Sequence, residues 1–116
     1  MWILYGIEVR EADTKGMMME LRGDLDLSSL DTLRETLNSV ASLREPTVVD
    51  LSGVTFLDLG CARELAIRAQ LYAHHLSLCN PSWQVQSTIR SCGLEDWFRF
   101  RPAPDLTEPP VFSEIP

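Results

Sequence analysis

The segment FLDLGCAREL (residues 56–65) contains the residues best placed to do chemistry. It predicts the end of a strand, a turn and the first turn of a helix, a junction whose free backbone N–H groups attract anions. The turn offers Asp58, Leu59, Gly60 and Cys61, with no serine or threonine to serve as a nucleophile or phosphate acceptor. A cysteine near a helix N-terminus can have a lowered pKa and sense redox changes. A single cysteine in an alanine-rich helix is more often a small packing residue, and we favour that interpretation here.

The other reactive side chains form no catalytic or metal-binding pattern. His74 and His75 are adjacent, and adjacent residues on a helix point about 100° apart, so this pair makes a poor chelate. Cys61, Cys79 and Cys92 lack C-x-x-C spacing and predict neither a zinc site nor a disulfide framework. Reduced thiols indicate a cytoplasmic location. Because no nucleophile, base and orienting acid occur together, we expect no enzyme, no metal and no cofactor.

Composition narrows the class of protein further. The chain has 116 residues and a formal net charge of −7, which predicts one domain that repels nucleic acid phosphates. The apolar run at residues 2–7 is too short for the core of a signal peptide, and no stretch is long enough to insert into a membrane. The acidic surface suits a partner with a basic face, or it serves only to keep the chain soluble.

The first half of the chain predicts a hairpin, a helix and a strand. Residues 2–11 and 17–26 have strand composition and flank a polar turn, so they predict an antiparallel hairpin. Leucine and valine recur at helical steps from Leu30 to Leu43, and Ser28 with Asp31 resembles a capping box. Residues 47–58 predict a strand, with a break at the Ser52-Gly53 pair.

The second half predicts alternating helices and strands. Residues 60–75 predict a helix and 76–80 a short strand. Ser82 is placed to cap a third helix that ends at Gly93, with Val85, Ile89 and Cys92 on its buried face. Residues 93–100 predict a last helix or strand. The chain therefore predicts an α/β fold with a mixed sheet of four or five strands, parallel in its centre and with the antiparallel hairpin at one side, and three or four helices. We expect residues 1–101 to form the domain and 102–116 a proline-rich flexible tail.

Three segments in series resemble one known family. GDLDLSSLDTLRETL (23–37) is similar to the Gly-Glu-Leu-Asp loop and first helix of STAS domains, the fold of bacterial anti-sigma-factor antagonists. VVDLSGVTFLD (48–58) is similar to the strand and loop that follow in that family. LSLCNPSWQVQSTIRSCGLEDWFRF (76–100) resembles the next strand, the Pro-x-Val helix and the Gly-Leu close. The resemblance implies a STAS-like sheet and a role in protein binding.

The resemblance also implies where phosphorylation would occur. In the antagonists the loop after this strand reads Asp-Ser-Ser/Thr-Gly, and an anti-sigma kinase phosphorylates the second hydroxyl and so releases the complex. Asp58 matches the aspartate, while Leu59, Gly60 and Cys61 take the places of the two hydroxyl residues and the glycine. With Gly60 at the acceptor position we expect no phosphorylation there. Ser52 and Thr55 lie nearby, but turn hydrogen bonding is the favoured interpretation of both.

The same resemblance implies a partner-binding surface. In the family the loop of Asp24 and Asp26 lies beside the acceptor loop. The predicted partner-binding residues are therefore Asp24, Asp26, Asp58, Leu59, Gly60, Cys61, Arg63 and Glu64. Two interpretations of the acids stay open: they bind arginines of a partner, or they only cap the two neighbouring helices.

Two functional hypotheses follow from these residues. The first is an anti-sigma-factor antagonist of a bacterial partner-switching pathway, without catalytic activity, whose partner is an anti-sigma factor related to serine kinases. Without a hydroxyl at position 60 such a protein would bind constitutively or answer to a different input. The alternative is a STAS subunit of a transporter assembly, or a module that senses a small ligand or nucleotide. A homodimer is compatible with either hypothesis.

Overall fold

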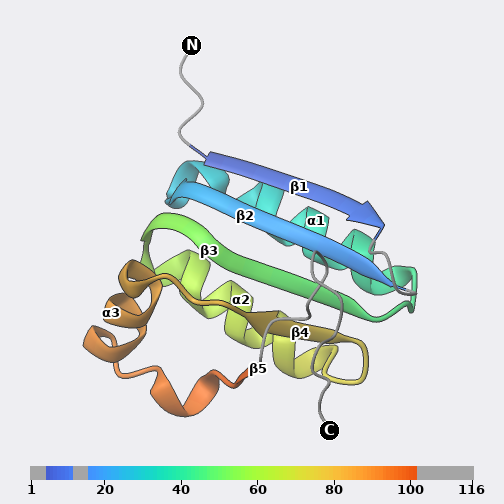
Figure 1. The fold of residues 1–116 in the computed structure, drawn as a ribbon. Helices are drawn as coiled ribbons and strands as arrows, with labels where there is room; N and C mark the ends of the chain where they lie inside the picture. Colours follow the sequence, from blue (N-terminus) through green and yellow to red (C-terminus); the bar gives the residue numbers. More distant parts are fainter. Residues whose placement is uncertain (1–4, 12–15, 102–116) are drawn as a thin grey trace, which may run out of the picture.

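The computed structural model describes residues 5–11 and 16–101 (Figure 1). Five strands form one sheet: β1 (Tyr5–Glu11), β2 (Met17–Leu25), β3 (Thr47–Leu57), β4 (Leu76–Cys79) and β5 (Phe100–Arg101). The helices are α1 (Leu30–Ser42), α2 (Leu59–Leu71) and α3 (Trp83–Ser91), with 3₁₀ turns η1 (Leu27–Ser29) and η2 (Glu95–Trp97).

The strands lie in chain order, β1-β2-β3-β4-β5. The pair β1–β2 is antiparallel, and the three other pairs are parallel. This arrangement confirms the predicted mixed sheet with an N-terminal hairpin and a parallel centre. The predicted tail, residues 102–116, lies outside the described residues, so its separation from the domain stays a prediction.

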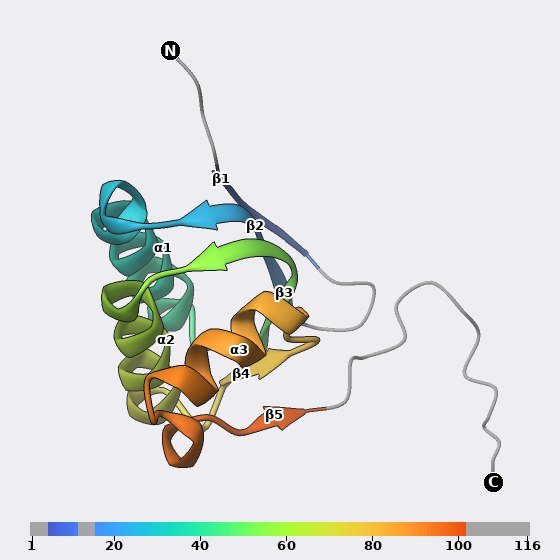
Figure 2. The ribbon, with the colours of Figure 1, turned by 90° about the vertical axis from the view of Figure 1, so that its left-hand side faces the viewer.

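The helices α1 and α2 lie side by side on one face of the sheet (Figures 1 and 2). The physical reason is that β2–α1–β3 and β3–α2–β4 are successive crossovers between parallel neighbours, and right-handed crossovers that advance in one direction place both helices on one face. The core between sheet and helices includes fully buried aliphatic side chains from each layer, among them Met19, Leu33, Leu37, Val49 and Leu65. Val85 and Ile89 bring α3 into the same core.

The predicted capping box at the first helix is wrong. The carboxylate of Asp26, and not the hydroxyl of Ser28, accepts the backbone N–H that opens this segment. The side chain of Ser28 donates to the same carboxylate. One 3₁₀ turn then precedes α1, which begins at Leu30. Asp26 comes before the predicted serine, and a carboxylate caps as well as a hydroxyl does.

The predicted strand break at Ser52-Gly53 is also wrong, because β3 runs through it without interruption. β3 has 11 residues and its partner β2 has 9. Two register shifts absorb the difference, one before the Arg22–Gly53 pair and one after the Gly23–Val54 pair. At each shift β3 contains one extra residue, which is the definition of a β-bulge. The glycine therefore marks a bulge and not an end.

Smaller corrections concern the ends and faces of the helices. The second helix begins at Leu59 and ends at Leu71, so residues 72–75 form a turn. Cys92 is exposed and caps the end of α3 without joining its buried face, and Leu43 is exposed at the end of α1. Met18 is buried although it lies between Met17 and Met19 in β2, and successive side chains of a strand point to opposite faces. The Ser82 cap and the Gly93 stop are confirmed, and residues 93–100 contain both a 3₁₀ turn and the start of a strand.

Gly53 generates a prediction about the sheet. A Cβ at this position would lie 2.9 Å from the Cβ of Arg22 on the paired strand. We expect Gly53→Val to lower the free energy of unfolding by about 1–3 kcal/mol, because the two strands must separate to admit it. Ser52→Val is the matched control at an exposed neighbour and should change stability by less than about 0.5 kcal/mol. Urea denaturation measures both, and equal effects of the two substitutions would contradict the steric argument.

Candidate functional site

The ends of β2 and β3 meet at one edge of the sheet and bring two loops together. Asp24 pairs with Phe56 across the strands, and Leu25 pairs with Leu57. The backbone N–H of Asp58 then donates to the carbonyl of Leu25 over 3.0 Å. The loop of Asp24 and Asp26 therefore lies beside the loop of Asp58, as the resemblance implied.

Each acid of the predicted site makes an internal hydrogen bond through its Oδ1 atom. Asp26 accepts from the backbone N–H and the hydroxyl of Ser28 at 2.9 and 2.6 Å. Asp58 accepts from the backbone N–H of Cys61 at 2.8 Å and caps α2. Asp24 accepts from the hydroxyl of Thr55 at 2.6 Å. Asp26 and Asp58 therefore do cap the segments that follow them, and whether they also bind a partner stays a prediction.

The bonds from Ser28 also affect the titration of Asp26. The hydroxyl of Ser28, followed by its backbone N–H, stabilises the carboxylate and lowers the pKa of Asp26 below its ordinary value. Because this pKa is lower in the folded state, the contribution of Asp26 to stability is present above the ordinary carboxyl pKa and is lost as the pH falls through the folded value. The cap is therefore intact at neutral pH.

Thr55 and Ser52, the two hydroxyl residues near the acceptor position, each make a hydrogen bond to an aspartate. The hydroxyl of Thr55 donates to Asp24, and the backbone N–H of Ser52 donates to the carboxylate of Asp50 at 2.9 Å. Both residues are exposed on β3. Thr55 therefore has the structural hydrogen bond that the sequence favoured, but both residues lie within β3 and not in a turn, so the predicted turn is wrong.

Cys61 lies beneath the surface and joins the two loops. Its side chain is fully buried, and its Sγ donates to the carbonyl oxygen of Asp26 at 3.3 Å. Its Sγ also lies 3.7 Å from the hydroxyl of Ser29. Burial raises the pKa of the Cys61 thiol to about 12. The thiol is therefore protonated and inaccessible, which supports the packing interpretation over redox sensing and removes Cys61 from direct contact with a partner.

Gly60 has an ordinary backbone conformation and open space around it. It is not among the residues with a positive φ angle in the described chain. A Cβ at this position would have as its nearest neighbours the Asp58 Oδ1 at 3.7 Å and the Leu30 Cδ2 at 3.9 Å, both ordinary contacts. The fold therefore admits a side chain at position 60. The backbone conformation does not require glycine there, so it does not explain why the hydroxyl residue is absent.

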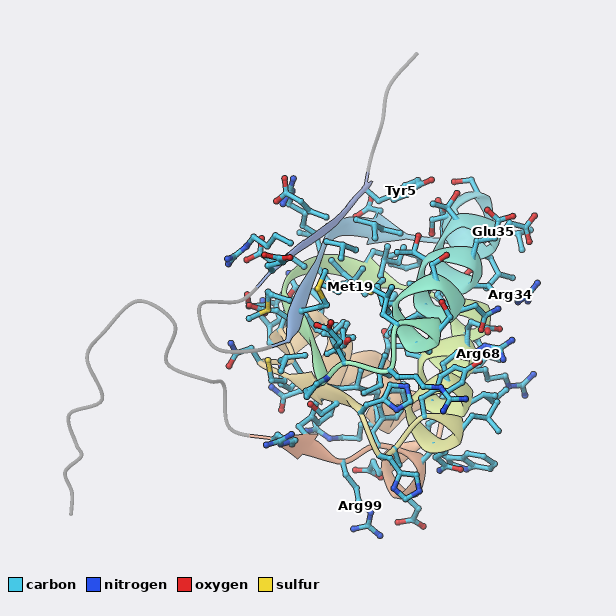
Figure 3. All side chains as sticks on the ribbon, turned by 90° about the vertical axis from the view of Figure 1, so that its right-hand side faces the viewer. Tyr5, Met19, Arg34, Glu35, Arg68 and Arg99 are labelled. Atoms are coloured by element: carbon cyan, nitrogen blue, oxygen red, sulfur yellow. The ribbon has the colours of Figure 1, made fainter. Side chains whose placement is uncertain are left out.

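Glu64 and Arg63, neighbours in sequence, have opposite environments. The side chain of Glu64 is buried and accepts from the Nε atoms of Arg34 on α1 and Arg68 on α2. Figure 3 shows Arg34 and Arg68 on these two adjacent helices. Glu64 therefore ties the helices together and is not placed to touch a partner, contrary to its assignment. Arg63 is exposed, with no carboxylate within 4.0 Å among the described residues.

Sequence reasoning missed an exposed apolar row along α2. Leu59, Ile67 and Leu71 are 40%, 43% and 61% exposed. They lie on one row of every fourth residue, which also contains the exposed Arg63 and which winds about 120° around the helix from Leu59 to Leu71. Near the ends of the strands, Leu27 and Phe56 are also exposed. The signal in the sequence was a helix with apolar residues on two sides, of which the core can bury only one.

A match to a family model shows which protein family the chain belongs to. A family model described as "Mlab, STAS domain" matches residues 9–106 of this chain. The chain belongs to the STAS domain family. No curated protein sequence matches the chain significantly.

Solved structures support the STAS fold. An anti-sigma factor antagonist from Mycobacterium paratuberculosis matches with a TM-score of 0.70 and 22% identity, over 88% of this chain and 87% of that chain. The Bacillus cell fate determinant SpoIIAA in its phosphorylated form matches with a TM-score of 0.61 and 15% identity, over 86% and 93% of the two chains. SLC26A9 matches with a TM-score of 0.62 and 16% identity, over 84% of this chain and 22% of its own.

The described residues contain neither a membrane-spanning helix nor a metal-binding cluster. None of the described helices is long and apolar enough to cross a membrane. The described histidine, cysteine, aspartate and glutamate side chains form no cluster of three or more that could hold a metal ion.

The capping role of Asp58 gives a prediction. We expect Asp58→Ala to lower the free energy of unfolding by about 1 kcal/mol, because the N–H of Cys61 loses its acceptor. Asp58→Asn keeps an oxygen at this position and should cost much less. Thermal and urea unfolding of the three proteins measure the effect. If Asn costs as much as Ala, the carboxylate charge and not the cap is what stabilises α2.

Proposed function

We propose that this STAS protein is a regulatory interaction module without catalytic activity, of the anti-sigma-factor antagonist type. Its partner surface lies at the edge where β2 and β3 end and continues along the exposed side of α2. This partner surface consists of Asp24, Asp26, Leu27, Phe56, Asp58, Leu59, Gly60, Arg63, Ile67 and Leu71.

The observation that carries the proposal is the combination of exposed apolar side chains with fixed carboxylates. Leu59 and Phe56 are 40% and 48% exposed beside Asp58 and Asp24. An interface of this composition has an apolar centre and charged groups that orient the partner. Each of the three aspartates is held through Oδ1, and among the described residues no donor bonds to an Oδ2 atom. These oxygens suit arginine side chains of a partner.

The comparisons support the proposed partner class. The Mycobacterium protein and SpoIIAA are described as anti-sigma factor antagonists, and their fold covers most of this chain. An anti-sigma factor related to serine kinases is therefore the proposed partner. Because position 60 carries no hydroxyl, we propose that binding is constitutive or controlled by the amount of each protein.

A second candidate function has its own support. The matching family model is described as "Mlab, STAS domain". The match to SLC26A9 covers only 22% of that chain, so the same fold also occurs as one part of a much larger protein. A STAS subunit of a transporter assembly would use the same partner surface against another protein. Co-purification with the product of each neighbouring gene separates the two candidates, since only one class of partner should bind.

The partner surface generates a prediction at Gly60. Gly60→Glu should weaken the complex with the anti-sigma factor about tenfold or more, because a bulky charge must be desolvated in the interface. Gly60→Ala is the matched control and should bind like the parent, since its Cβ meets only ordinary contacts. Calorimetric titration measures binding, and circular dichroism checks the fold. A folded Gly60→Glu protein that binds as tightly as the parent would place the partner elsewhere.

The absent hydroxyl generates a second prediction. Incubation of the parent with its anti-sigma kinase and ATP should leave the mass unchanged. Gly60→Ser should gain one phosphoryl group, because the backbone at position 60 accepts a side chain without strain. Gly60→Ala should stay unmodified under the same conditions. Mass spectrometry reads all three proteins, and phosphorylation of the parent at Ser52 or Thr55 would overturn constitutive binding.

A further inference from the structure

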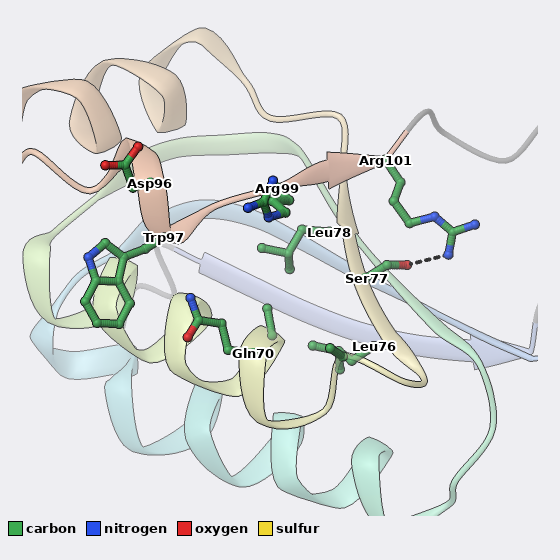
Figure 4. Close-up of a pocket in the computed structure, with 10 residues that line it drawn as sticks. Gln70, Leu76, Ser77, Leu78, Asp96, Trp97, Arg99 and Arg101 are labelled. Atoms are coloured by element: carbon green, nitrogen blue, oxygen red, sulfur yellow. Dashed lines mark hydrogen bonds between the residues drawn. The ribbon is translucent and has the colours of Figure 1, made fainter.

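A hollow of about 400 Å³ lies between the C-terminal end of α2, the strand β4 and the last described segment of the chain (Figure 4). Its polar lining comes from Gln70 of α2, Ser77 of β4, and Asp96, Arg99 and Arg101 of the last segment. Trp97 adds an aromatic ring, and aliphatic side chains of α2 and β4 complete the walls. The volume falls in the range of small-molecule sites.

The hollow results from the length of β5. This strand has two residues and pairs only with Leu78 and Cys79. The first half of β4, Leu76 and Ser77, therefore has no strand partner on that side within the described chain. The facing residues are Ala69 of α2 and Ala73 of the turn that follows it, and their small side chains leave the space unfilled.

The charges of this hollow differ from those of the rest of the protein. Arg99 and Arg101 line it together with one acid, Asp96, so the lining carries a net positive charge in a chain with a formal net charge of −7. Five other arginines have a carboxylate within 4.0 Å: Arg10, Arg22, Arg34, Arg68 and Arg90. Among the described residues neither Arg99 nor Arg101 has such a partner, and Arg101 donates only to the hydroxyl of Ser77 at 3.3 Å.

We infer that this hollow binds a small organic anion, a carboxylate or phosphate attached to a flat apolar body. The guanidinium group of Arg99, without a carboxylate partner among the described residues, recognises an anionic group through charged hydrogen bonds. The guanidinium group of Arg101 is turned toward Ser77 (Figure 4) and adds positive charge to the lining. The indole of Trp97, 49% exposed at the rim, offers a face on which a ring can stack. The apolar walls favour an anion with an apolar body over an inorganic ion.

The inference does not depend on the proposed function. Gln70 of the hollow is the sequence neighbour of Leu71 of the partner surface, and adjacent residues of a helix point about 100° apart, so the two side chains lie on different sides of α2. The hollow shares no residue with the partner surface. Failure of either proposal would therefore leave the other unaffected.

The test uses phenyl phosphate as the probe and the full chain labelled with ¹⁵N. Titration should shift the indole N–H resonance of Trp97 and the backbone resonances of residues 96–101 in a saturable manner. Inorganic phosphate supplies the charge without the ring, and phenol supplies the ring without the charge. We expect each to bind at least about tenfold more weakly than phenyl phosphate, since each lacks one of the two interactions. Equal affinity for inorganic phosphate would reduce the hollow to a general anion-binding patch and overturn the inference.

Substitutions locate the site. Arg99→Gln should weaken phenyl phosphate binding about fivefold to tenfold, the effect of one charged hydrogen bond, and Arg101→Gln, which removes only a more distant charge, should weaken it less. Arg44→Gln is the matched control, because Arg44 is also exposed and has no carboxylate within 4.0 Å among the described residues, but it lies at the end of α1. The same spectra show whether each variant is folded. An equal loss in the Arg44 variant, or shifts that avoid residues 96–101, would overturn the inference.

Discussion

The carbonyl oxygen of Asp26 is the point on which the geometry of the candidate site depends. It accepts from the backbone N–H and the hydroxyl of Ser29 at 2.9 and 2.8 Å, and from the thiol of Cys61 at 3.3 Å. The hydrogen bonds to this one oxygen therefore connect the end of β2 to the first helical segment and to the start of α2. The carboxylates of Asp26 and Asp58 can face solvent as caps because this buried junction fixes the backbone beneath them. Polar groups that are fully satisfied in this way specify one arrangement of two loops.

The sequence predicted the order of elements and the mixed sheet because each segment has one dominant period. The alternation in β2 and the leucine spacing in α1 are both long enough to be unambiguous. The bulges of β3 could not be predicted, because they depend on how β3 pairs with β2 and Gly53 alone suggests only a turn. The capping box failed because the helical segment begins earlier than the leucine spacing indicates: Asp26 accepts the N–H of Ser28, and a 3₁₀ turn precedes α1, so Ser28 is not the residue that caps it.

At the site, the sequence located the loops but not the exposure of their residues. Asp24, Asp26, Asp58 and Gly60 come together as the resemblance implied, whereas Cys61 and Glu64 are buried. Neighbours in a helical sequence point in different directions, so Arg63 and Glu64 have opposite environments. Burial of Glu64 depends on Arg34, which is distant in sequence and reaches it only because α1 packs beside α2. The open hollow beside β4 was likewise unpredictable, since it depends on the length of β5.

The apolar row along α2 has a consequence for how the protein is made. Leu59, Ile67 and Leu71 remain exposed in the single chain, and apolar surface of this kind favours self-association or capture by the cell's quality-control machinery. If the proposed partner covers these side chains, copies produced in excess of it would carry this liability, while copies in a complex would not. Synthesis in fixed proportion to that partner, as from one transcript, would remove the surplus. Under the proposed function, the composition of one helix would therefore constrain gene dosage.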